Sequence, residues 1–327
     1  MNLKKEHLLS ITSAEEFHEK TLEVFQYQYQ GNKTYREFCD YLKVNSKKVS
    51  QLEEIPFLPI QFFKSRKVTT RNAVPEMIFT SSGTTGSVNS KHYVTDLEIY
   101  EMSFIRTFEA FYGSISDYCI LALLPSYLER NGSSLIYMAD TLIKKSAHAQ
   151  SGFYLNDLDA LVKTLESLIK ANQKTILLGV SFALLDLAER INFPLKNTIV
   201  METGGMKGRR KEMVREELHS ILKKAFGVSA IHSEYGMTEL LSQAYSKGEG
   251  IFKCPPWMNV FIRDTEDPLS YQKQGKTGGI NIIDLANVNS CSFIATQDLG
   301  KVFGNRLFEV LGRFDHADIR GCNLMVI

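Results

Sequence analysis

One segment of the chain combines residue types that bind phosphate. Small hydroxyl residues alternate with glycines directly after a short apolar run, 76–79, which is typical of a buried strand. Glycines leave backbone N–H groups accessible and the hydroxyls add donors, so both suit polyphosphate oxygens. Lys91, five residues beyond the second glycine, supplies a mobile positive charge. A ligand-free surface loop is the alternative that composition alone favours. The predicted phosphate loop consists of Ser82, Gly83, Thr84, Thr85 and Gly86.

A second stretch, 234–239, has the side chains to complete a nucleotide site. The hydroxyl of Thr238 can donate a hydrogen bond to a phosphate oxygen. A carboxylate beside a polyphosphate requires a cation between them, so Glu239 predicts a bound Mg²⁺. The aromatic ring of Tyr235 can stack on a nucleobase, and Gly236 is the next residue of the motif. A helix N-terminus capped by Thr238 is the alternative for this stretch.

The pattern of strands and helices must bring these segments together. Near-continuous apolar runs predict buried strands that alternate with helices, which indicates an α/β fold with a parallel sheet and helices on both faces. Ligands bind beyond the carboxyl ends of such strands, so the phosphate loop, a turn at 203–205 and the stretch after Ser233 are expected at one edge. Residues 126–134 are expected to form a loop. The expected strands are 117–125, 175–180, 197–202 and 229–233, and the helices 96–112, 155–172, 182–191 and about 209–226.

The two ends of the chain differ from this centre. Capping boxes at 13–16 and 34–37 predict two amphipathic helices, and two prolines predict an extended segment at 55–64. From about residue 250 the pattern changes to short strands joined by turns, which indicates a smaller antiparallel subdomain. We therefore expect an α/β core, 1–250, and a β-rich unit, 251–327. The strands expected in that unit are 255–263, 278–284, 290–296 and 306–311.

Composition and charge exclude several classes of function. The 327 residues are 44% hydrophobic and 23% charged, which is ordinary for a soluble globular protein. A net charge of +1 gives no field that favours nucleic acid or a membrane surface. No apolar stretch approaches the roughly 20 residues that span a bilayer, and no signal peptide is recognised. The five cysteines form no CxxC pair, so we expect free thiols in a reducing cytoplasm and no zinc site.

In their order along the chain, these motifs resemble the adenylate-forming superfamily, which includes acyl-CoA synthetases, firefly luciferase and peptide-synthetase adenylation domains. The run Ser-Ser-Gly-Thr-Thr-Gly is similar to its phosphate loop, and Tyr235 to Glu239 is similar to its Tyr-Gly-x-Thr-Glu motif. The resemblance implies that Thr238 contacts phosphate and that Glu239 contacts the metal. In the superfamily the loop lysine usually lies closer to the second glycine, whereas Val88-Asn89-Ser90 precedes Lys91 here.

Two other turns and a hinge motif are similar to further parts of the same superfamily. Thr203-Gly204-Gly205 resembles the glycine turn that lines the adenine pocket. The stretch around Asp298 resembles a Thr-Gly-Asp motif with Gln297 in place of glycine, which implies that Asp298 accepts hydrogen bonds from the ribose hydroxyls. Gly312-Arg313 resembles a hinge whose arginine also reaches the nucleotide. Singly each match is weak, since an aspartate in a turn is usually a turn residue, and their order makes the argument.

Within the superfamily, the chain resembles the bacterial acyl-protein synthetase (LuxE) family. The resemblance includes Ile55 to Lys64, Arg320-Gly321-Cys322 and the end of the sequence at Ile327, shortly after the hinge motif. Other members continue into a mobile C-terminal domain that carries a lysine for adenylation, and we expect that domain to be absent here. The resemblance implies that the enzyme uses ATP to convert a carboxylic acid, expected to be a long-chain fatty acid, to acyl-AMP. It further implies acyl transfer to its own cysteine and then to an acyl reductase or another acceptor.

Cys322 is the candidate acyl acceptor on this resemblance. An acyl adenylate is a mixed anhydride, which a thiolate attacks readily. The alternative is an inert thiol beside a buried final strand, 323–327. Together with Cys322 and Glu239, Lys91 is assigned to catalysis, because it could partly replace the lysine of the absent domain.

Two further functions remain open from the sequence. The protein could be a ligase that transfers the acyl group to CoA or a carrier protein, with Cys322 structural. It could also be a nucleotide-binding subunit without full catalysis. The sequence leaves open the chain length of the acid, whether the acid is fatty or aryl, the final acceptor and the oligomeric state.

Overall fold

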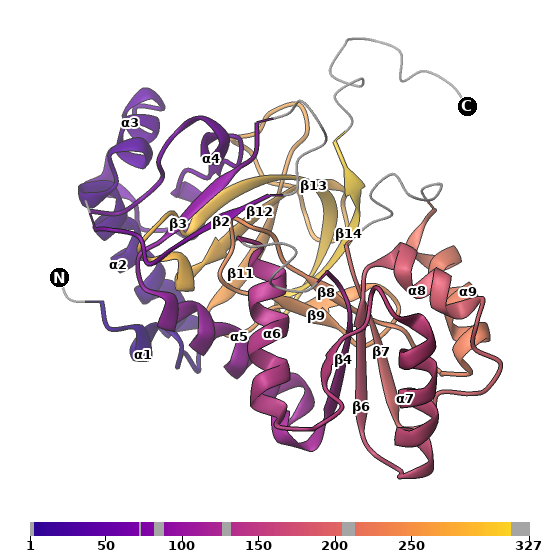
Figure 1. Ribbon diagram of the computed structural model, residues 1–327. Helices are drawn as coiled ribbons and strands as arrows, with labels where there is room; N and C mark the ends of the chain where they lie inside the picture. Colours follow the sequence, from indigo (N-terminus) through magenta and orange to yellow (C-terminus); the bar gives the residue numbers. More distant parts are fainter. Residues whose placement is uncertain (1–2, 72, 82–87, 126–131, 205–212, 315–327) are drawn as a thin grey trace, which may run out of the picture.

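The computed structural model of the chain describes residues 3–71, 73–81, 88–125, 132–204 and 213–314. Within these ranges the fold is built on a twelve-stranded sheet and a separate two-stranded sheet (Figure 1). One half of the large sheet is parallel and the other half antiparallel. The α/β class that the sequence predicts is therefore confirmed.

Parallel strands form the half of the sheet that the alternating pattern predicts. In spatial order they are β8 (His232–Tyr235), β7 (Thr198–Thr203), β6 (Thr175–Gly179), β4 (Cys119–Leu123) and β5 (Gly152–Phe153). Every residue of β4 and β6 is buried, as expected for strands covered on both faces.

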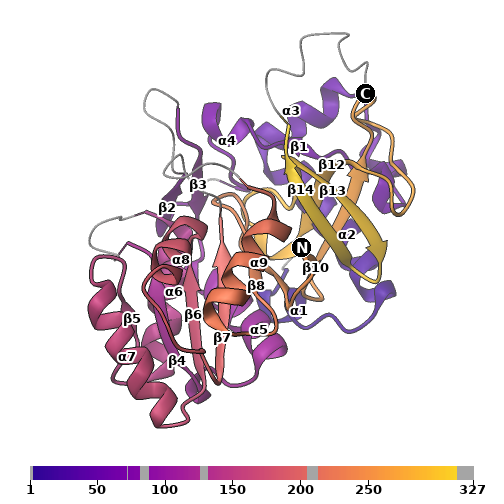
Figure 2. The same ribbon diagram turned by 90° about the vertical axis from the view of Figure 1, so that its right-hand side faces the viewer.

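Helices cover both faces of these parallel strands. They are α5 (Leu97–Tyr112), α6 (Ser134–Ser146), α7 (Leu158–Lys170), α8 (Ser181–Ala188) and α9 (Arg215–Phe226). Figure 1 shows α5 and α6 on one face and α7, α8 and α9 on the other, as right-handed crossovers require. Figure 2 shows α8 and α9 in front of the parallel strands.

Antiparallel strands continue the same sheet beyond β8. In spatial order they are β9 (Ala244–Ser246), β10 (Ile251–Lys253), β14 (Leu307–Arg313), β13 (Phe293–Gly304), β12 (Gly278–Asp284) and β11 (Met258–Arg263). The short strand β1 (Leu58–Pro59) pairs in parallel with β13. Backbone hydrogen bonds thus run without a break from the parallel half to the strands after residue 250.

A hairpin outside the large sheet carries the predicted phosphate loop. Its strands are β2 (Met77–Thr80) and β3 (Lys91–Val94), which pair antiparallel. The two ends of the loop are fastened to each other, because the amide of Ser81 donates to the carbonyl of Ser90 over 3.2 Å and the amide of Ser90 donates to Oγ of Ser81 over 2.9 Å. The stem of the loop is therefore well defined.

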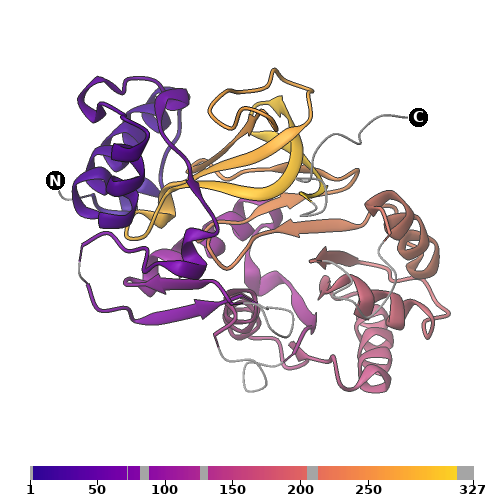
Figure 3. The same cartoon turned by 90° about the horizontal axis from the view of Figure 1, so that it is seen from above.

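The N-terminal helices pack against the antiparallel half (Figure 3). Helix α2 begins at a capping serine, as predicted, and its Gln28 donates to the backbone oxygens of Asn287 and Val288. Tyr35 stacks on Phe293 of β13 at 5.7 Å between ring centroids. The helices are α1 (Lys5–Leu8), α2 (Ala14–Gly31), α3 (Lys33–Tyr41) and α4 (Phe62–Ser65), and short 3-10 turns are η1 (Ser46–Lys48), η2 (Leu52–Glu54), η3 (Ile115–Asp117) and η4 (Leu285–Asn287).

The structure differs from several of the predicted elements. Helix α3 is capped by Asn32, two residues before the predicted box at 34–37. The strand expected at 229–233 is found as β8, 232–235. Helix α6, which begins at Ser134, was not predicted. The segment 55–64 ends in a helical turn, α4, because both of its prolines precede that turn. The strand expected at 290–296 extends to Gly304 as β13. None of the helices in the described ranges is sufficiently long and apolar to cross a bilayer.

Candidate active site

The stem of the phosphate loop contacts the segment that carries Thr238 and Glu239. Nδ1 of His92, on β3, lies 2.8 Å from the carbonyl oxygen of Thr238. Because a carbonyl only accepts, Nδ1 carries the proton. Ser90, two residues earlier, interacts with the carboxyl group of Glu239. The structure therefore brings together two segments that the sequence assigns separately to phosphate and metal.

His92 is fully buried, and nothing in the motif assignment pointed to its contact with Thr238. The ring meets Phe63 edge-on, with 5.7 Å between centroids. Burial lowers the pKa of His92 to about 4, so the ring is neutral at physiological pH. Its other nitrogen, Nε2, is buried without a hydrogen-bond partner among the described residues. His92 thus connects the loop stem to Thr238 without contributing charge.

Glu239 is a buried carboxyl group on which the charges of Arg313 and Lys64 act. Its exposed fraction is 5%, and burial raises its pKa, while the Ser90 side chain and the charges of Arg313 and Lys64 oppose that rise. No cluster of three or more His, Cys, Asp or Glu side chains in the described ranges could hold a metal ion. A carboxylate in this setting fits Mg²⁺, which typically takes one or two carboxylates together with phosphate oxygens and water.

Asp298 lies at the centre of a buried hydrogen-bonded group. The hydroxyl of Tyr235 donates to Oδ2 of Asp298 over 2.7 Å, and Nε of Arg313 lies 3.1 Å from Oδ1. Arg313 is otherwise largely exposed, so its remaining N–H groups are available to a ligand. An ionised carboxylate has several lone-pair positions, and two donors leave some of them for further hydroxyl groups. This arrangement fits the ribose role that the sequence assigns to Asp298.

Tyr235 occupies a different environment from that of an open stacking platform. Its ring packs against Phe252 and Phe308, with centroid distances of 5.8 and 5.4 Å. Burial and the neighbouring charge of Asp298 raise the pKa of its hydroxyl well above the usual range. The hydroxyl therefore stays protonated and donates to Asp298, a role that the sequence did not indicate.

Glu234 is a further buried acid at the end of β8, and the sequence analysis missed it. Oγ1 of Thr203, on the neighbouring strand β7, donates to Oε2 of Glu234 over 2.5 Å. Burial raises the pKa of Glu234 to about 7, and the charge of Glu202 adds to the rise. The signal that could have identified it is a carboxylate at the carboxyl end of a strand predicted to be parallel, where ligands of such sheets bind.

Glycine occurs at positions 204 and 236, near this edge of the sheet, for two different structural reasons. Gly204, directly after β7, has a φ of +71°, where a side chain would be strained although no atom blocks it. At Gly236 a Cβ would lie 2.5 Å from Oε1 of Glu234, so the carboxyl group of Glu234 would have to shift. Both predicted glycines are thus explained by their local geometry.

Of the remaining predicted site residues, one is exposed and the others lie outside the described ranges, whereas the cysteines of the described ranges are buried. Lys91 is exposed on β3, on the strand face opposite to His92. Burial raises the thiol pKa of each cysteine within the described ranges, as expected for inert core thiols: Cys39, Cys119, Cys254 and Cys291. Predicted residues outside the described ranges are Ser82, Gly83, Thr84, Thr85, Gly86, Gly205 and Cys322.

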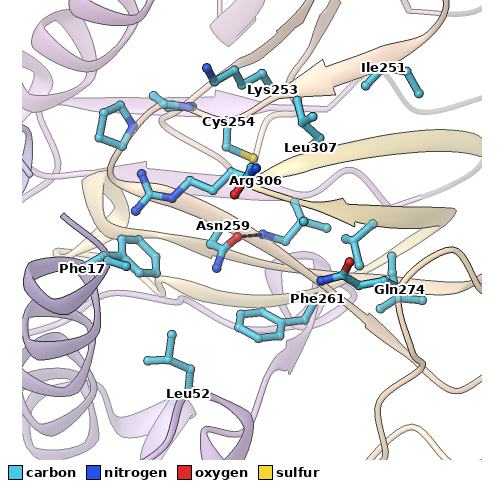
Figure 4. A pocket seen from close by; sticks show the side chains of 18 of the residues that line it. Phe17, Leu52, Ile251, Lys253, Cys254, Asn259, Phe261, Gln274, Arg306 and Leu307 are labelled. Atoms are coloured by element: carbon cyan, nitrogen blue, oxygen red, sulfur yellow. Dashed lines mark hydrogen bonds between the residues drawn. The ribbon is translucent and has the colours of Figure 1, made fainter. Parts of the chain in front are cut away.

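A cavity of about 1150 Å³ lies apart from this site (Figure 4). It is bounded by the start of α2, by β10 and β11, and by the turn between β13 and β14. None of the predicted site residues lines it. The candidate site is accordingly defined by converging side chains at the strand ends and not by this cavity.

Comparison with known proteins identifies relatives along almost the whole chain. The family model described as "Acyl-protein synthetase, LuxE" matches residues 8–327. A long-chain-fatty-acid–luciferin-component ligase of Vibrio harveyi is 24% identical over 339 residues, which cover 92% of this chain and 84% of the relative. The protein of the same name from Aliivibrio fischeri is 24% identical over 330 residues, covering 92% and 85%.

Solved structures share the fold at low sequence identity. A 2-hydroxyisobutyryl-CoA ligase in complex with 2-HIB-AMP and CoA matches with a TM-score of 0.69 and 12% identity, over 92% of this chain and 75% of the ligase. ATP-bound MatB from Rhodopseudomonas palustris matches with a TM-score of 0.54 and 16% identity, over 74% of this chain and 49% of MatB. At these identities the likeness concerns the fold alone.

Proposed function

This chain belongs to the acyl-protein synthetase (LuxE) family, and we propose that it converts a long-chain fatty acid to acyl-AMP, loads the acyl group on Cys322 and passes it to a partner. The family assignment makes it a ligase that activates an acid. The fatty acid is supported by the names of the two relatives, which are long-chain-fatty-acid ligases. An acyl reductase, or another thiol or amine acceptor, is the partner that we propose. The cytoplasm supplies both ATP and reduced thiols.

The observation that carries the proposal is the convergence at Asp298 and Glu239. Tyr235 and Arg313 hold Asp298, and the charge of Arg313 also acts on Glu239. This convergence supports a ribose contact and a metal contact to one nucleotide. The stem of the phosphate loop meets the same segment through Ser90 and His92, which supports a polyphosphate beside it.

In the first step the substrate carboxylate attacks the α-phosphorus of ATP, and pyrophosphate leaves. Asp298 accepts hydrogen bonds from the ribose hydroxyls, and Arg313 contacts the nucleotide. Thr238, the loop hydroxyls and Lys91 bind the phosphate oxygens and stabilise the charge that develops on them. When bound, Mg²⁺ held by Glu239 neutralises the polyphosphate.

In the second step the Cys322 thiolate attacks the acyl carbon of acyl-AMP. A carbon–sulfur bond forms, the bond from carbon to the phosphate oxygen breaks, and AMP leaves with the electron pair. The thioester then reacts with the acceptor and regenerates the thiol. Two other outcomes compete with this one: direct transfer from acyl-AMP to CoA or a carrier, and nucleotide binding without full catalysis.

Acid-dependent exchange of labelled pyrophosphate into ATP tests the first step. Exchange is expected with long-chain fatty acids in a panel that also contains short-chain and aryl acids. ATP-dependent thermal stabilisation without exchange for any acid would leave only the nucleotide-binding function. Exchange restricted to aryl acids would contradict the fatty acid as substrate.

An acylation assay tests the second step. The protein is incubated with labelled fatty acid and ATP and is then denatured without reducing agent. Protein-bound label that hydroxylamine releases is expected in the native enzyme and is expected to be absent in Cys322→Ser. Cys119→Ser, which removes a buried thiol far along the chain from the proposed acceptor, is the matched control. Undiminished label in Cys322→Ser would contradict the role of the cysteine.

A further inference from the structure

The cavity of about 1150 Å³ has an unbalanced charge (Figure 4). Its cationic lining residues are Lys247, Lys253 and Arg306, whereas Glu53 is its only lining acid within the described ranges. It lies at the far end of the β13–β14 hairpin from Asp298 and Arg313. Since β14 separates Arg306 from Arg313, the two arginines are roughly 20 Å apart. A ligand in this cavity would therefore be separate from the nucleotide.

Arg306 is the central cation of the cavity. Its guanidinium lies over the ring of Phe17, 4.8 Å from the centroid, and Figure 4 shows the side chain crossing the hollow towards that ring. Burial lowers the pKa of Arg306, and no carboxylate in the described ranges forms an ion pair with it. A partly buried guanidinium with unused donors is costly, and a carboxylate or phosphate matches its planar geometry.

The backbone at Arg306 has a conformation that is unusual for a residue with a large side chain. Asn305 and Arg306 have φ angles of +50° and +61°, in the left-handed region where glycine is favoured. They form the turn between β13 and β14, directly after Gly304. Retaining a large side chain in a strained conformation is a feature of functional positions as well as of tightly packed ones.

The surroundings of Arg306 combine apolar surface with more positive charge. Figure 4 shows Phe17, Phe261, Leu307 and Leu52 around the hollow. Nζ of Lys247 lies 5.5 Å from the ring centroid of Tyr112, at another part of the wall. Apolar walls around a central cation suit a ligand with both an anionic head and a hydrocarbon chain.

We propose that this cavity binds a single-chain amphiphilic anion, with a carboxylate or phosphate head on Arg306 and a hydrocarbon chain along Phe261 and Leu307. The walls of the cavity come from segments distant in the sequence, which favours a small molecule over an extended protein surface. The inference is independent of the proposed acyl-adenylate chemistry, because it involves none of the residues assigned to that chemistry.

Calorimetric titration of the whole protein with amphiphiles of equal chain length tests the proposal. The probes are dodecanoate, dodecyl phosphate, dodecyltrimethylammonium and dodecyl maltoside, each below its micelle concentration. One or both anions are expected to bind, and the cationic and neutral probes are not. The preferred anion identifies the head group. The fluorescence of Trp257, the sole tryptophan and the neighbour of lining residue Pro256, is expected to report the same binding. Equal binding of all four probes, or of none, would overturn the proposal.

Arg306→Gly is the decisive variant, because glycine suits the left-handed backbone and so preserves the turn. Anion affinity is expected to fall about ten- to hundredfold. Asn305→Gly relieves the same kind of backbone strain but keeps Arg306, so its affinity is expected to match that of the native protein. Pyrophosphate exchange is expected to persist in Arg306→Gly, which separates this site from the one for the reacting acid. Native affinity in Arg306→Gly, or loss of exchange together with binding, would overturn the proposal.

Discussion

The hydroxyl of Tyr235 donates a 2.7 Å hydrogen bond to Asp298, 63 residues further along the chain. Tyr235 ends the parallel strand β8, and Asp298 lies in the antiparallel strand β13. The bond thus joins the two halves of the sheet at the place where we expect the ribose. Arg313, on β14, contacts the second oxygen of the same carboxylate.

Tyr235→Phe keeps the packing of the ring on Phe252 and Phe308 and removes only the bond to Asp298. We expect the KM for ATP to rise about three- to tenfold, because one hydrogen bond to a charged group that orients Asp298 is lost. Steady-state pyrophosphate exchange measures this effect. Tyr118→Phe removes a hydroxyl that donates to the carbonyl of Tyr112, remote from the site, and its KM is expected to be unchanged. An unchanged KM in Tyr235→Phe would separate this bond from nucleotide binding.

Asp298→Ala tests the ribose contact directly. The native enzyme is expected to use ATP in preference to 2′,3′-dideoxy-ATP, since in our proposal Asp298 accepts hydrogen bonds from both ribose hydroxyls. In the variant we expect kcat/KM for ATP to fall about ten- to hundredfold and the preference to disappear. Asp267→Ala, at an exposed turn, is the control. A preference that persists in Asp298→Ala would place the ribose elsewhere.

Glu239→Gln tests the metal contact. The amide has nearly the same volume but no charge, so we expect the Mg²⁺ concentration for half-maximal exchange to rise at least about tenfold. Burial raises the pKa of Glu239, so its neutral replacement is expected to leave thermal stability unchanged or slightly higher. Magnesium titration and thermal denaturation measure the two effects. The same shift in Glu266→Gln, an exposed control, would show a nonspecific effect of charge.

Glu234 is expected to make stability depend on pH. Its pKa rises from 4.5 to about 7 on folding, chiefly through burial. Between these values the folded protein holds a proton that the unfolded chain has lost, so the free energy of unfolding falls as pH rises and levels off above about 7. Glu234→Gln is expected to remove this slope and to be more stable at pH 8 by roughly 1–3 kcal/mol.

Chemical denaturation across this pH range measures the effect of Glu234. Glu166→Gln, on the exposed face of α7, is expected to retain the native slope. An identical slope in Glu234→Gln would mean that Glu234 ionises in the folded protein as it does in the unfolded chain.

The sequence predicted those parts of the fold that local patterns determine. Strands β4, β6 and β7 were found because their apolar runs are buried on both faces, and α5 because its apolar spacing is regular. Helix α6 was missed, and the absence of a side-chain cap does not explain this, because α8 and α9 also lack one and were predicted. Local patterns do not predict how segments distant in the sequence are arranged, because tertiary packing determines that arrangement.

The same distinction applies to the site. Asp298 and Glu239 were identified from motifs, whereas the partners of their segments were not. His92 meets Thr238 across 146 residues, and Thr203 meets Glu234 across 31 residues. Contacts at such separations depend on which strands become neighbours, and the sequence alone specified only the order of the strands along the chain.

The bond between His92 and Thr238 also has a consequence for the order of folding. The β2–β3 hairpin belongs to no other sheet among the described strands, and a chain separation of 146 residues is bridged where His92 meets Thr238. Closing so long a loop is entropically unfavourable, and contacts of this range are typically slow to form. We expect refolding to restore far-ultraviolet circular dichroism first and ATP binding later. A newly synthesised chain would then be folded for some time before it is able to bind its nucleotide.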